Sequence, residues 1–183
     1  NNSNTKTCGA TVTVVDTIKP VVACQNVTLN LDATGNGSVT AAQVDNGSSD
    51  ACGIASLVLS KTAFNCSNIG GNAVVLTVTD TKGNSLTCGA TVTVVDTITP
   101  IATCRNITLN LDAAGNGSVT AAQINNGSSD ACGIASLVLS KTAFNCSNIG
   151  ANAVVLTVTD NNSNTKTCGA TVTVVDTIKP VVA

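Results

Sequence analysis

Residues 73–96, AVVLTVTDTKGNSLTCGATVTVVD, decide the fold class of this chain. In AVVLTVTD (73–80) and again in CGATVTVVD (88–96), apolar Val and Leu residues alternate with Thr. A period of two residues is typical of a β-strand with one buried face. The DTKGN stretch between them (80–84) is rich in turn-forming residues, so the sequence predicts two strands joined by a turn.

Upstream of this pair the same alternation continues, in NVTLNLD (26–32), SVTAAQV (38–44) and IASLVLS (54–60). Turn-rich stretches separate these segments, and no stretch shows a helical period with caps. About six or seven short strands with turns every 8 to 12 residues is the pattern of an immunoglobulin-like or fibronectin-like sandwich. We therefore expect an all-β fold, with two sheets packed around Val, Ile and Leu.

An internal repeat with a period of 80 residues organises the chain. Residues 17–96 align with 97–176 without a gap, and 15 of the 80 positions differ. Residues 1–23 are identical to 161–183, two periods later. A unit of this size can be a small domain of its own. We expect four parts, in tandem: the last strand of a preceding repeat (1–16), two complete repeats (17–96 and 97–176) and the start of a following repeat (177–183).

Composition excludes several classes of function. The chain has no His, Trp, Tyr, Met or Glu, its only aromatic residues are two Phe, and its net charge is −2. The commonest general bases are therefore missing, and we expect no enzyme activity and no organic cofactor. The absence of a basic face argues against nucleic acid as a partner. The apolar runs are far shorter than the ~20 residues that span a bilayer, so we expect no membrane insertion.

Nine cysteines and no CxxC motif favour a disulfide framework formed in an oxidising compartment. Cys24 lies in the first strand and Cys88 early in the last, and these strands run side by side in an immunoglobulin-like sandwich. Cys52 and Cys66 bracket a strand and a returning segment. We therefore expect Cys24–Cys88 and Cys52–Cys66, with Cys104–Cys168 and Cys132–Cys146 as the equivalent pairs of the second repeat.

Two alternatives to this pairing remain open. Cys8 could pair with Cys24, and Cys88 with Cys104, across the linkers, although a stiff TIKP segment would then have to fold back. The cysteines could also be free thiols that pack as small apolar side chains.

Aspartates are expected to gather where one repeat meets the next, in two equivalent sets: Asp16, Asp50 and Asp80, and Asp96, Asp130 and Asp160. Three carboxylates supply the oxygen ligands that calcium takes, so a calcium ion is the possible cofactor. The alternative is that each aspartate caps a turn through its own backbone.

The order DTIKPVVAC, SSDACG, VTDTKGNSLTC and VTVVD resembles the hyalin-repeat class of immunoglobulin-like domains. With its FNCSNIG segment, the unit is similar to the tandem repeats of cell-surface adhesins of bacteroidetes, including gliding-motility adhesins. This resemblance covers the whole chain. It implies an exported cell-surface adhesin or filament, carried out by type 9 secretion. The Asp-Thr-Ile triplets resemble the O-glycosylation signal of these bacteria, which makes Thr17, Thr97 and Thr177 candidate glycan sites.

Taken together, these features favour a structural stalk over a binding module. A Cys24–Cys88 bond would carry a pulling force past the residues between the two strands, so each repeat would be a stiff spacer. The expected partners are neighbouring repeats, other chains in a filament, and a surface or glycan ligand at a distal tip. The alternative is that the repeats themselves bind glycans, but two Phe and one Arg offer few anchors for a binding pocket.

Overall fold

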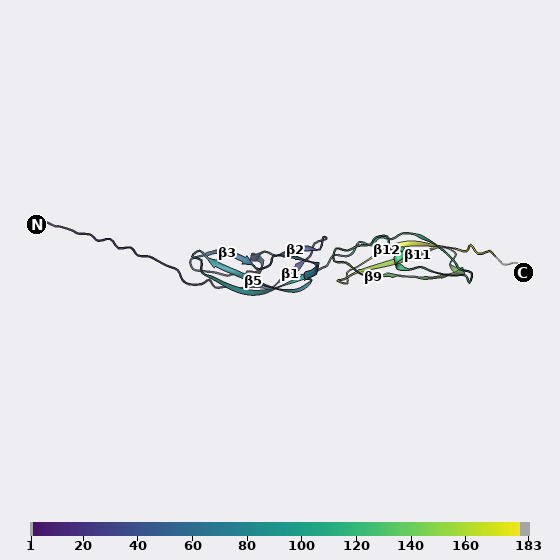
Figure 1. Cartoon of the computed structure of the whole chain (residues 1–183), viewed down its shortest axis with the longest axis horizontal. Helices are drawn as coiled ribbons and strands as arrows, with labels where there is room; N and C mark the ends of the chain where they lie inside the picture. The colour runs from purple at the N-terminus through teal and green to yellow at the C-terminus, as the bar shows by residue number, and fades with distance from the viewer. Residues whose placement is uncertain (1, 180–183) are drawn as a thin grey trace. The chain divides into compact units, whose positions relative to one another are not determined.

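The computed structural model describes residues 2–179 and consists mainly of β-strands (Figure 1). The first repeat contains β1 (Val27–Asn30), β2 (Asn36–Ser38), α1 (Ala41–Val44), β3 (Ile54–Leu59), β4 (Ala63–Asn65), the 3₁₀ turn η1 (Cys66–Asn68), β5 (Gly70–Asp80) and β6 (Ser85–Val95). The second repeat contains β7 (Ile107–Asn110), β8 (Asn116–Ser118), α2 (Ala121–Ile124), β9 (Ile134–Leu139), β10 (Ala143–Asn145), η2 (Cys146–Asn148), β11 (Gly150–Asp160) and β12 (Thr165–Val175). The all-β prediction is confirmed.

Each repeat holds a four-stranded sheet and a two-stranded sheet. Their strand orders are β1-β6-β5-β3 and β2-β4 in the first repeat, and β7-β12-β11-β9 and β8-β10 in the second. β11 and β12 form a long antiparallel hairpin, and β12 pairs parallel with β7. The first and last strands of the repeat therefore lie side by side, as in an immunoglobulin-like sandwich.

The central hairpin, β5 and β6, follows directly from residues 73–96. Along β5, Val74, Leu76 and Val78 are buried, whereas Val75 between them is 44% exposed. At the turn, the Asp80 carboxylate accepts hydrogen bonds from the Lys82 and Asn84 amides, at 2.7 and 2.9 Å. An aspartate that bonds the backbone just after it stabilises a tight turn, and this one reverses the chain between the strands.

The core of each repeat is aliphatic. In the second repeat it consists of Leu111, Val119, Ile124, Leu139, Phe144, Val154, Leu156, Val158, Ala170, Val172 and Val174. The corresponding positions of the first repeat are also buried, apart from the one matching Ala170. The core is thus made of the alternating apolar residues that the sequence indicated.

One predicted strand is wrong in part. Residues 38–44 alternate like a strand, but only Ser38 is in β2, and residues 41–44 form α1. The Thr40 amide donates to the Gln43 side chain at 2.8 Å, and Thr40 and Gln43 form a capping box. Such a box satisfies the free amides of a helix start, and so it favours one helical turn over a strand. Val44 is still buried.

The described residues before Val21 form no helix or strand. Residues 1–16 have the same sequence as 161–176, a segment that contains the whole of β12. β12 is held by hydrogen bonds to β11 and β7, and such strand pairing is absent from residues 2–16 in the described part of the chain. Asn1 and residues 180–183, which belong to the predicted flanking parts, lie outside the described residues.

By its contacts the chain divides into two compact units. One contains residues up to Val27, Val39–Thr62 and Ala73–Val92, and the other contains Thr28–Ser38, Ala63–Asn72 and the chain from Thr93 onward. One end of the first repeat therefore belongs to the same unit as the second repeat. Within residues 2–179 no helix has the length and apolar character needed to cross a membrane.

Candidate functional site

One internal disulfide locks each repeat. Cys24 is bonded to Cys88 and Cys104 to Cys168, with Cα–Cα distances of 6.0 and 5.8 Å. Each bond ties the segment just before the first strand to the last strand, β6 or β12. These bonds agree with the expected pairing and differ from the alternative in which Cys24 and Cys88 pair across the linkers.

The third disulfide differs from the expected pairing. Cys66 is bonded to Cys132, not to Cys52, and the expected Cys132–Cys146 bond is therefore absent as well. The expected Cys52–Cys66 bond requires the segment between these residues to form a hairpin. In the structure β3 pairs with β5 and β4 pairs with β2, so these two strands lie in different sheets and do not return the chain to Cys52.

The Cys66–Cys132 bond lies within the second compact unit, at the turn that connects β1 to β2. Gly35 in this turn has a positive φ of 74°. A Cβ atom there would lie 2.5 Å from Cys66 Sγ and 3.2 Å from Ala131 Cβ. Glycine is therefore required both for the backbone conformation and for the close approach of Ala131. We call residues 32–35 and Cys66 the turn end of the first repeat.

On the opposite side of this bond, Ala131, the residue before Cys132, lines a small cavity. The cavity measures about 340 Å³ and is lined by Ala33, Ile98, Thr99, Ile101, Ser129, Asp130 and Ala131. Ala33 comes from the turn end, and the other residues come from the linker and the loop before β9. We call residues 96–101 and 129–132 the receiving end of the second repeat.

Each of these two surfaces has an equivalent in the other repeat, and each equivalent lines a cavity of its own. The receiving end of the first repeat, residues 16–21 and 49–52, lines a cavity of about 580 Å³. The turn end of the second repeat, residues 112–115 and Cys146, lines another, of about 600 Å³. The cysteines of these two surfaces, Cys52 and Cys146, are exposed free thiols, as is Cys8.

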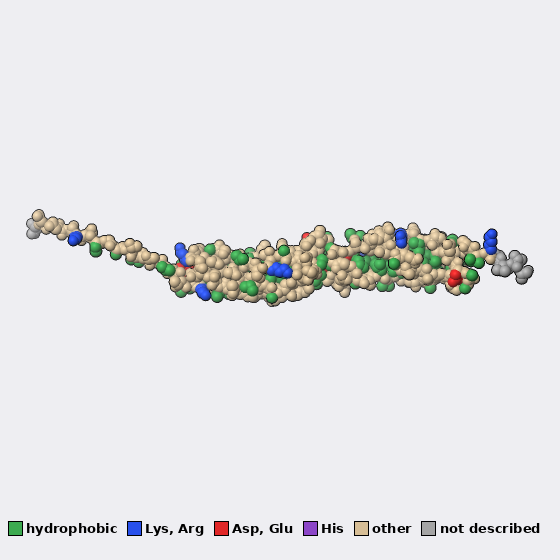
Figure 2. Space-filling model, viewed as in Figure 1, with side chains coloured by type: hydrophobic (Ala, Val, Ile, Leu, Met, Phe, Trp, Pro, Cys, Tyr) green, Lys and Arg blue, Asp and Glu red, His purple; other side chains and the backbone are tan. Residues whose placement is uncertain are grey.

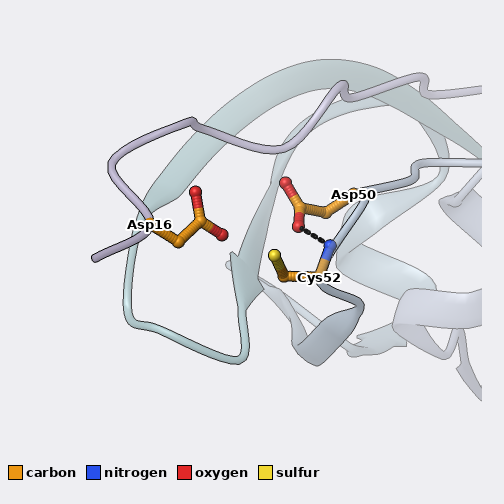
Figure 3. Close-up of side chains that lie close together, drawn as sticks. All are labelled: Asp16, Asp50 and Cys52. Carbon is orange, nitrogen blue, oxygen red and sulfur yellow. Dashed lines mark hydrogen bonds between the residues drawn. The ribbon is translucent and has the colours of Figure 1, made fainter. Parts of the chain in front are cut away.

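Four of the six predicted metal-binding aspartates lie at the receiving ends. Carboxylate oxygens of Asp16 and Asp50 lie within 4.8 Å of each other and of Cys52 Sγ, and Figure 3 shows these side chains converging. Asp96, Asp130 and Cys132 form the equivalent group. Asp80 and Asp160 belong to neither group, because their carboxylates close the β5–β6 and β11–β12 turns.

Most of these carboxylates also cap turns, as the alternative interpretation proposed. Asp50 accepts a hydrogen bond from the Cys52 amide at 2.7 Å (Figure 3). Asp96 accepts one from the Ile98 amide at 3.0 Å. Asp96 is only 7% exposed, however, and its Oδ2 has no hydrogen-bond partner in the described part of the chain. A buried carboxylate oxygen that is unpartnered in this way is costly unless a further group satisfies it.

Four groups of the first repeat have a shifted pKa: Asp32, Asp45, Cys52 and Asp80. Hydrogen bonding to the Asp16 carboxylate, and the negative charge of that group, raise the pKa of the Cys52 thiol. Burial raises the pKa of Asp80, but hydrogen bonds from Asn84, Lys82 and Gly83 lower it by more, so its pKa lies below the ordinary value of 3.8.

The remaining predicted sites are at the surface. Thr17, Thr97 and Thr177 are exposed, so a glycan could reach each of them. Charged side chains are sparse on the face shown in Figure 2, consistent with the ten acidic and eight basic residues in the whole sequence.

No protein-family model and no curated protein sequence matches the chain. Among solved structures it is similar to extracellular cadherin domains 1–4 of protocadherin gamma B7, with 12% identity and a TM-score of 0.39, over 86% of this chain and 51% of that one. It is also similar to human mucin-like protocadherin EC1-2, with 11% identity and a TM-score of 0.37, over 86% and 98%.

The fibronectin(III)-like modules of Clostridium thermocellum CbhA are more distant, with 10% identity and a TM-score of 0.27, over 86% and 94% of the two chains. The chain spans about half the length of the protocadherin gamma B7 chain that it matches. At these TM-scores the similarity is remote, and the fold assignment rests on the strands and sheets described above.

Proposed function

We propose that these repeats form the shaft of a large secreted cell-surface adhesin, in which each repeat is a stiff, disulfide-locked spacer. The observation that supports this proposal most directly is the Cys66–Cys132 bond. It joins residues of successive repeats covalently, in addition to the peptide chain between them. A second covalent connection restricts the rotation and separation of the two repeats, which is the property that a spacer needs.

The internal disulfides make the shaft nearly inextensible. A force applied at the two ends passes from Cys24 directly to Cys88, and from Cys104 directly to Cys168. The two cysteines of each bond are 64 positions apart in the sequence, and the chain between them carries none of the force. Between the two bonds, the load follows only the 16 positions from Cys88 to Cys104, so most of each repeat is shielded from the force.

The disulfides also bear on location. Three disulfides in two small domains are typical of proteins that fold in an oxidising compartment, so we place the chain outside the cytoplasm. The resemblance to hyalin repeats of bacteroidete adhesins supports the finer proposal of a cell-surface protein exported by type 9 secretion, with a role in gliding motility. Bundling of chains into a filament and a ligand at a distal tip belong to the same proposal.

The structure offers little for the alternative in which the repeats themselves bind glycans. The two Phe side chains, Phe64 and Phe144, are each only 3% exposed. The Lys141 ammonium lies 4.7 Å from the centre of the Phe144 ring. Neither ring is available to stack on a sugar, which supports the spacer.

We also propose that calcium stiffens the connection between repeats. Asp96 and Asp130 would hold the ion, because a hard cation takes carboxylate oxygens. The unpartnered, buried Oδ2 of Asp96 supports this proposal. Cys132 would not be a ligand, since its sulfur is part of a disulfide.

Single-molecule pulling of the two-repeat chain tests the spacer. Without reductant, we expect no unfolding step that corresponds to the 64 residues enclosed by each internal disulfide. With reductant, each repeat should lengthen by roughly 200 Å, the extended span of those residues. The Cys24→Ser/Cys88→Ser variant is the control, because its first repeat should lengthen without reductant. Steps of that size in the unreduced original chain would contradict the proposal.

A further inference from the structure

The receiving end of the first repeat and the turn end of the second repeat carry the equivalents of the two cysteines that form the Cys66–Cys132 bond. Shifting Cys132 back by one period of 80 residues gives Cys52, and shifting Cys66 forward by one period gives Cys146. Cys66 and Cys132 are bonded to each other, whereas Cys52 and Cys146 are free. Each of the two free thiols is therefore the counterpart of a cysteine that has a partner elsewhere in the same structure.

The surroundings of the free Cys146 thiol match those of the bonded Cys66. The Cys146 thiol donates to the Gly115 carbonyl at 3.6 Å, which is the distance between Cys66 Sγ and the Gly35 carbonyl. Gly115 has a φ of 75°, against 74° at Gly35. The thiol at the turn end of the second repeat is thus held in the same position as its bonded counterpart.

The difference between the two turn ends lies in what covers them. A Cβ at Gly35 would meet Ala131 and Cys132, but a Cβ at Gly115 would meet only Cys146 Sγ. Gly35 is buried and Gly115 is half-buried. Likewise, Ala33 lines the cavity at the receiving end of the second repeat, whereas the larger cavity at the receiving end of the first repeat has no such residue in its wall.

We propose that the receiving end of the first repeat is a docking site for the turn end of another copy of the same 80-residue unit in the same chain, and that docking leads to a disulfide at Cys52. By the same geometry, Cys146 forms a disulfide with the cysteine at the receiving end of a copy that follows. The occupant is a tandem copy because, at the Cys66–Cys132 bond, the turn end of one repeat already meets the receiving end of the next. The surfaces at Cys52 and Cys146 are the equivalents of these two surfaces. This inference rests on the array of repeats proposed above.

The chemistry is a thiol–disulfide exchange that needs an oxidant, here a small disulfide such as oxidised glutathione. One cysteine thiolate attacks the oxidant, forms a mixed disulfide and releases one glutathione thiol. The partner thiolate then attacks the protein sulfur of the mixed disulfide and releases the second. Two protein thiols lose two protons and two electrons, and the oxidant gains them as two glutathione thiols.

A chain extended by its own sequence tests the proposal. Residues 97–160 are added in front of Asn1, which restores the natural order because residues 1–23 repeat 161–183. The added segment contains three cysteines, equivalent to Cys104, Cys132 and Cys146. After refolding in a glutathione buffer, the thiols are alkylated, counted by mass, and located by a non-reducing peptide map.

The original chain has three free thiols. If Cys52 bonds the added copy of Cys146, and Cys8 bonds the added copy of Cys104, the extended chain keeps two: Cys146 and the added copy of Cys132. If only Cys8 finds its partner, four remain, and a free Cys52 in a folded extended chain overturns the proposal. A bond from Cys52 to any other cysteine overturns it too.

A pair of variants separates docking from mere proximity. Ala51 corresponds to Ala131, which contacts the turn end, so Ala51→Glu in the extended chain should leave Cys52 free to react. Ala55→Glu, at an exposed position of β3, is the matched control and should keep the bond. Equal bonding in both variants would overturn the docking site.

If the extended chain does not fold, residues 24–96 are added after Ala183 instead. The free thiols should then stay at three, whereas an unpaired Cys146 and an unpaired partner would raise them by two, to five. These readouts count thiols and do not depend on force or length. A failed spacer in the pulling experiment is therefore distinguishable from a failed docking site.

Discussion

The α-carbons of Cys66 and Cys132 lie 5.2 Å apart, although 66 positions separate these residues in the sequence. A distance in this range is what a disulfide requires. The bond closes a loop that contains β5, β6, the linker and the first part of the second repeat. Its removal is therefore expected to loosen the connection between repeats and to lower the stability of the two-repeat chain.

The first prediction concerns this bond. Cys66→Ser/Cys132→Ser should lower the free energy of unfolding by about 4 kcal/mol, the chain-entropy value for a loop of this length. Denaturant titration of the variant and of the original chain measures the difference. Cys24→Ser/Cys88→Ser removes the disulfide that closes a loop of similar length within one repeat, and it is the matched control. No loss in the first variant would mean that the bond adds no constraint.

The second prediction concerns the reactivity of Cys52. Because the Asp16 carboxylate raises the pKa of the Cys52 thiol, Asp16→Asn should lower this pKa. The thiolate fraction at neutral pH would then increase, and alkylation should become severalfold faster. The rate is measured against pH in a Cys8→Ser background, with Cys146 as the internal reference. An unchanged Cys52 profile beside an unchanged Cys146 profile would contradict the role of Asp16.

The third prediction follows from the lowered pKa of Asp80. A carboxyl whose pKa is lower in the folded state stabilises the fold above its unfolded value, near 3.8, and loses this effect as the pH falls through the folded value. The thermal midpoint of the original chain should therefore drop more steeply below about pH 4 than that of Asp80→Asn. Calorimetry at a series of acidic pH values measures both slopes. Parallel curves would show that Asp80 does not contribute to the acid sensitivity.

The fourth prediction compares two glycines in the same conformation. Gly35→Ala and Gly115→Ala both force a side chain into the left-handed region, which costs about 1–2 kcal/mol. Gly35→Ala should cost more, because Ala131 lies 3.2 Å from the new Cβ and no equivalent atom lies near Gly115. Equilibrium unfolding gives both values. An equal loss would indicate that Ala131 moves aside freely.

The fifth prediction addresses calcium. If the ion binds Asp96 and Asp130, calcium should raise the thermal midpoint of the chain, and a chelator should reverse the increase. Asp96→Asn should abolish the calcium response, while Asp112→Asn, which alters a turn carboxylate at the other end of the second repeat, should keep it. An identical midpoint with calcium and with chelator would leave turn capping as the role of Asp96.

The sequence predicts the sheets well because each repeat has a clear two-residue period. Residues 73–96 form the hairpin, and Val74, Leu76 and Val78 are buried as the alternation requires. Residues 41–44 show where the same reasoning fails. A capping box of Thr40 and Gln43 competes with the alternation, and over four residues the local hydrogen bonds decide the outcome.

The sequence could not predict the Cys66–Cys132 disulfide between repeats, and here the reason is different. In an array of near-identical units, Cys66 can pair with Cys52 or with the copy of that residue one period later, Cys132. Both choices satisfy the same motif and the same cysteine count. Only the placement of Cys66 after β4, in the sheet away from Cys52, distinguishes them.

The three disulfides have a topological consequence for a chain that is exposed to proteases. Cys66 lies inside the loop closed by Cys24 and Cys88, and Cys132 lies inside the loop closed by Cys104 and Cys168. Every peptide bond between Cys24 and Cys168 is therefore bypassed by another covalent route. A single cut anywhere in that span, even in the linker, leaves one molecule, and only a second cut or a reductant can release a fragment.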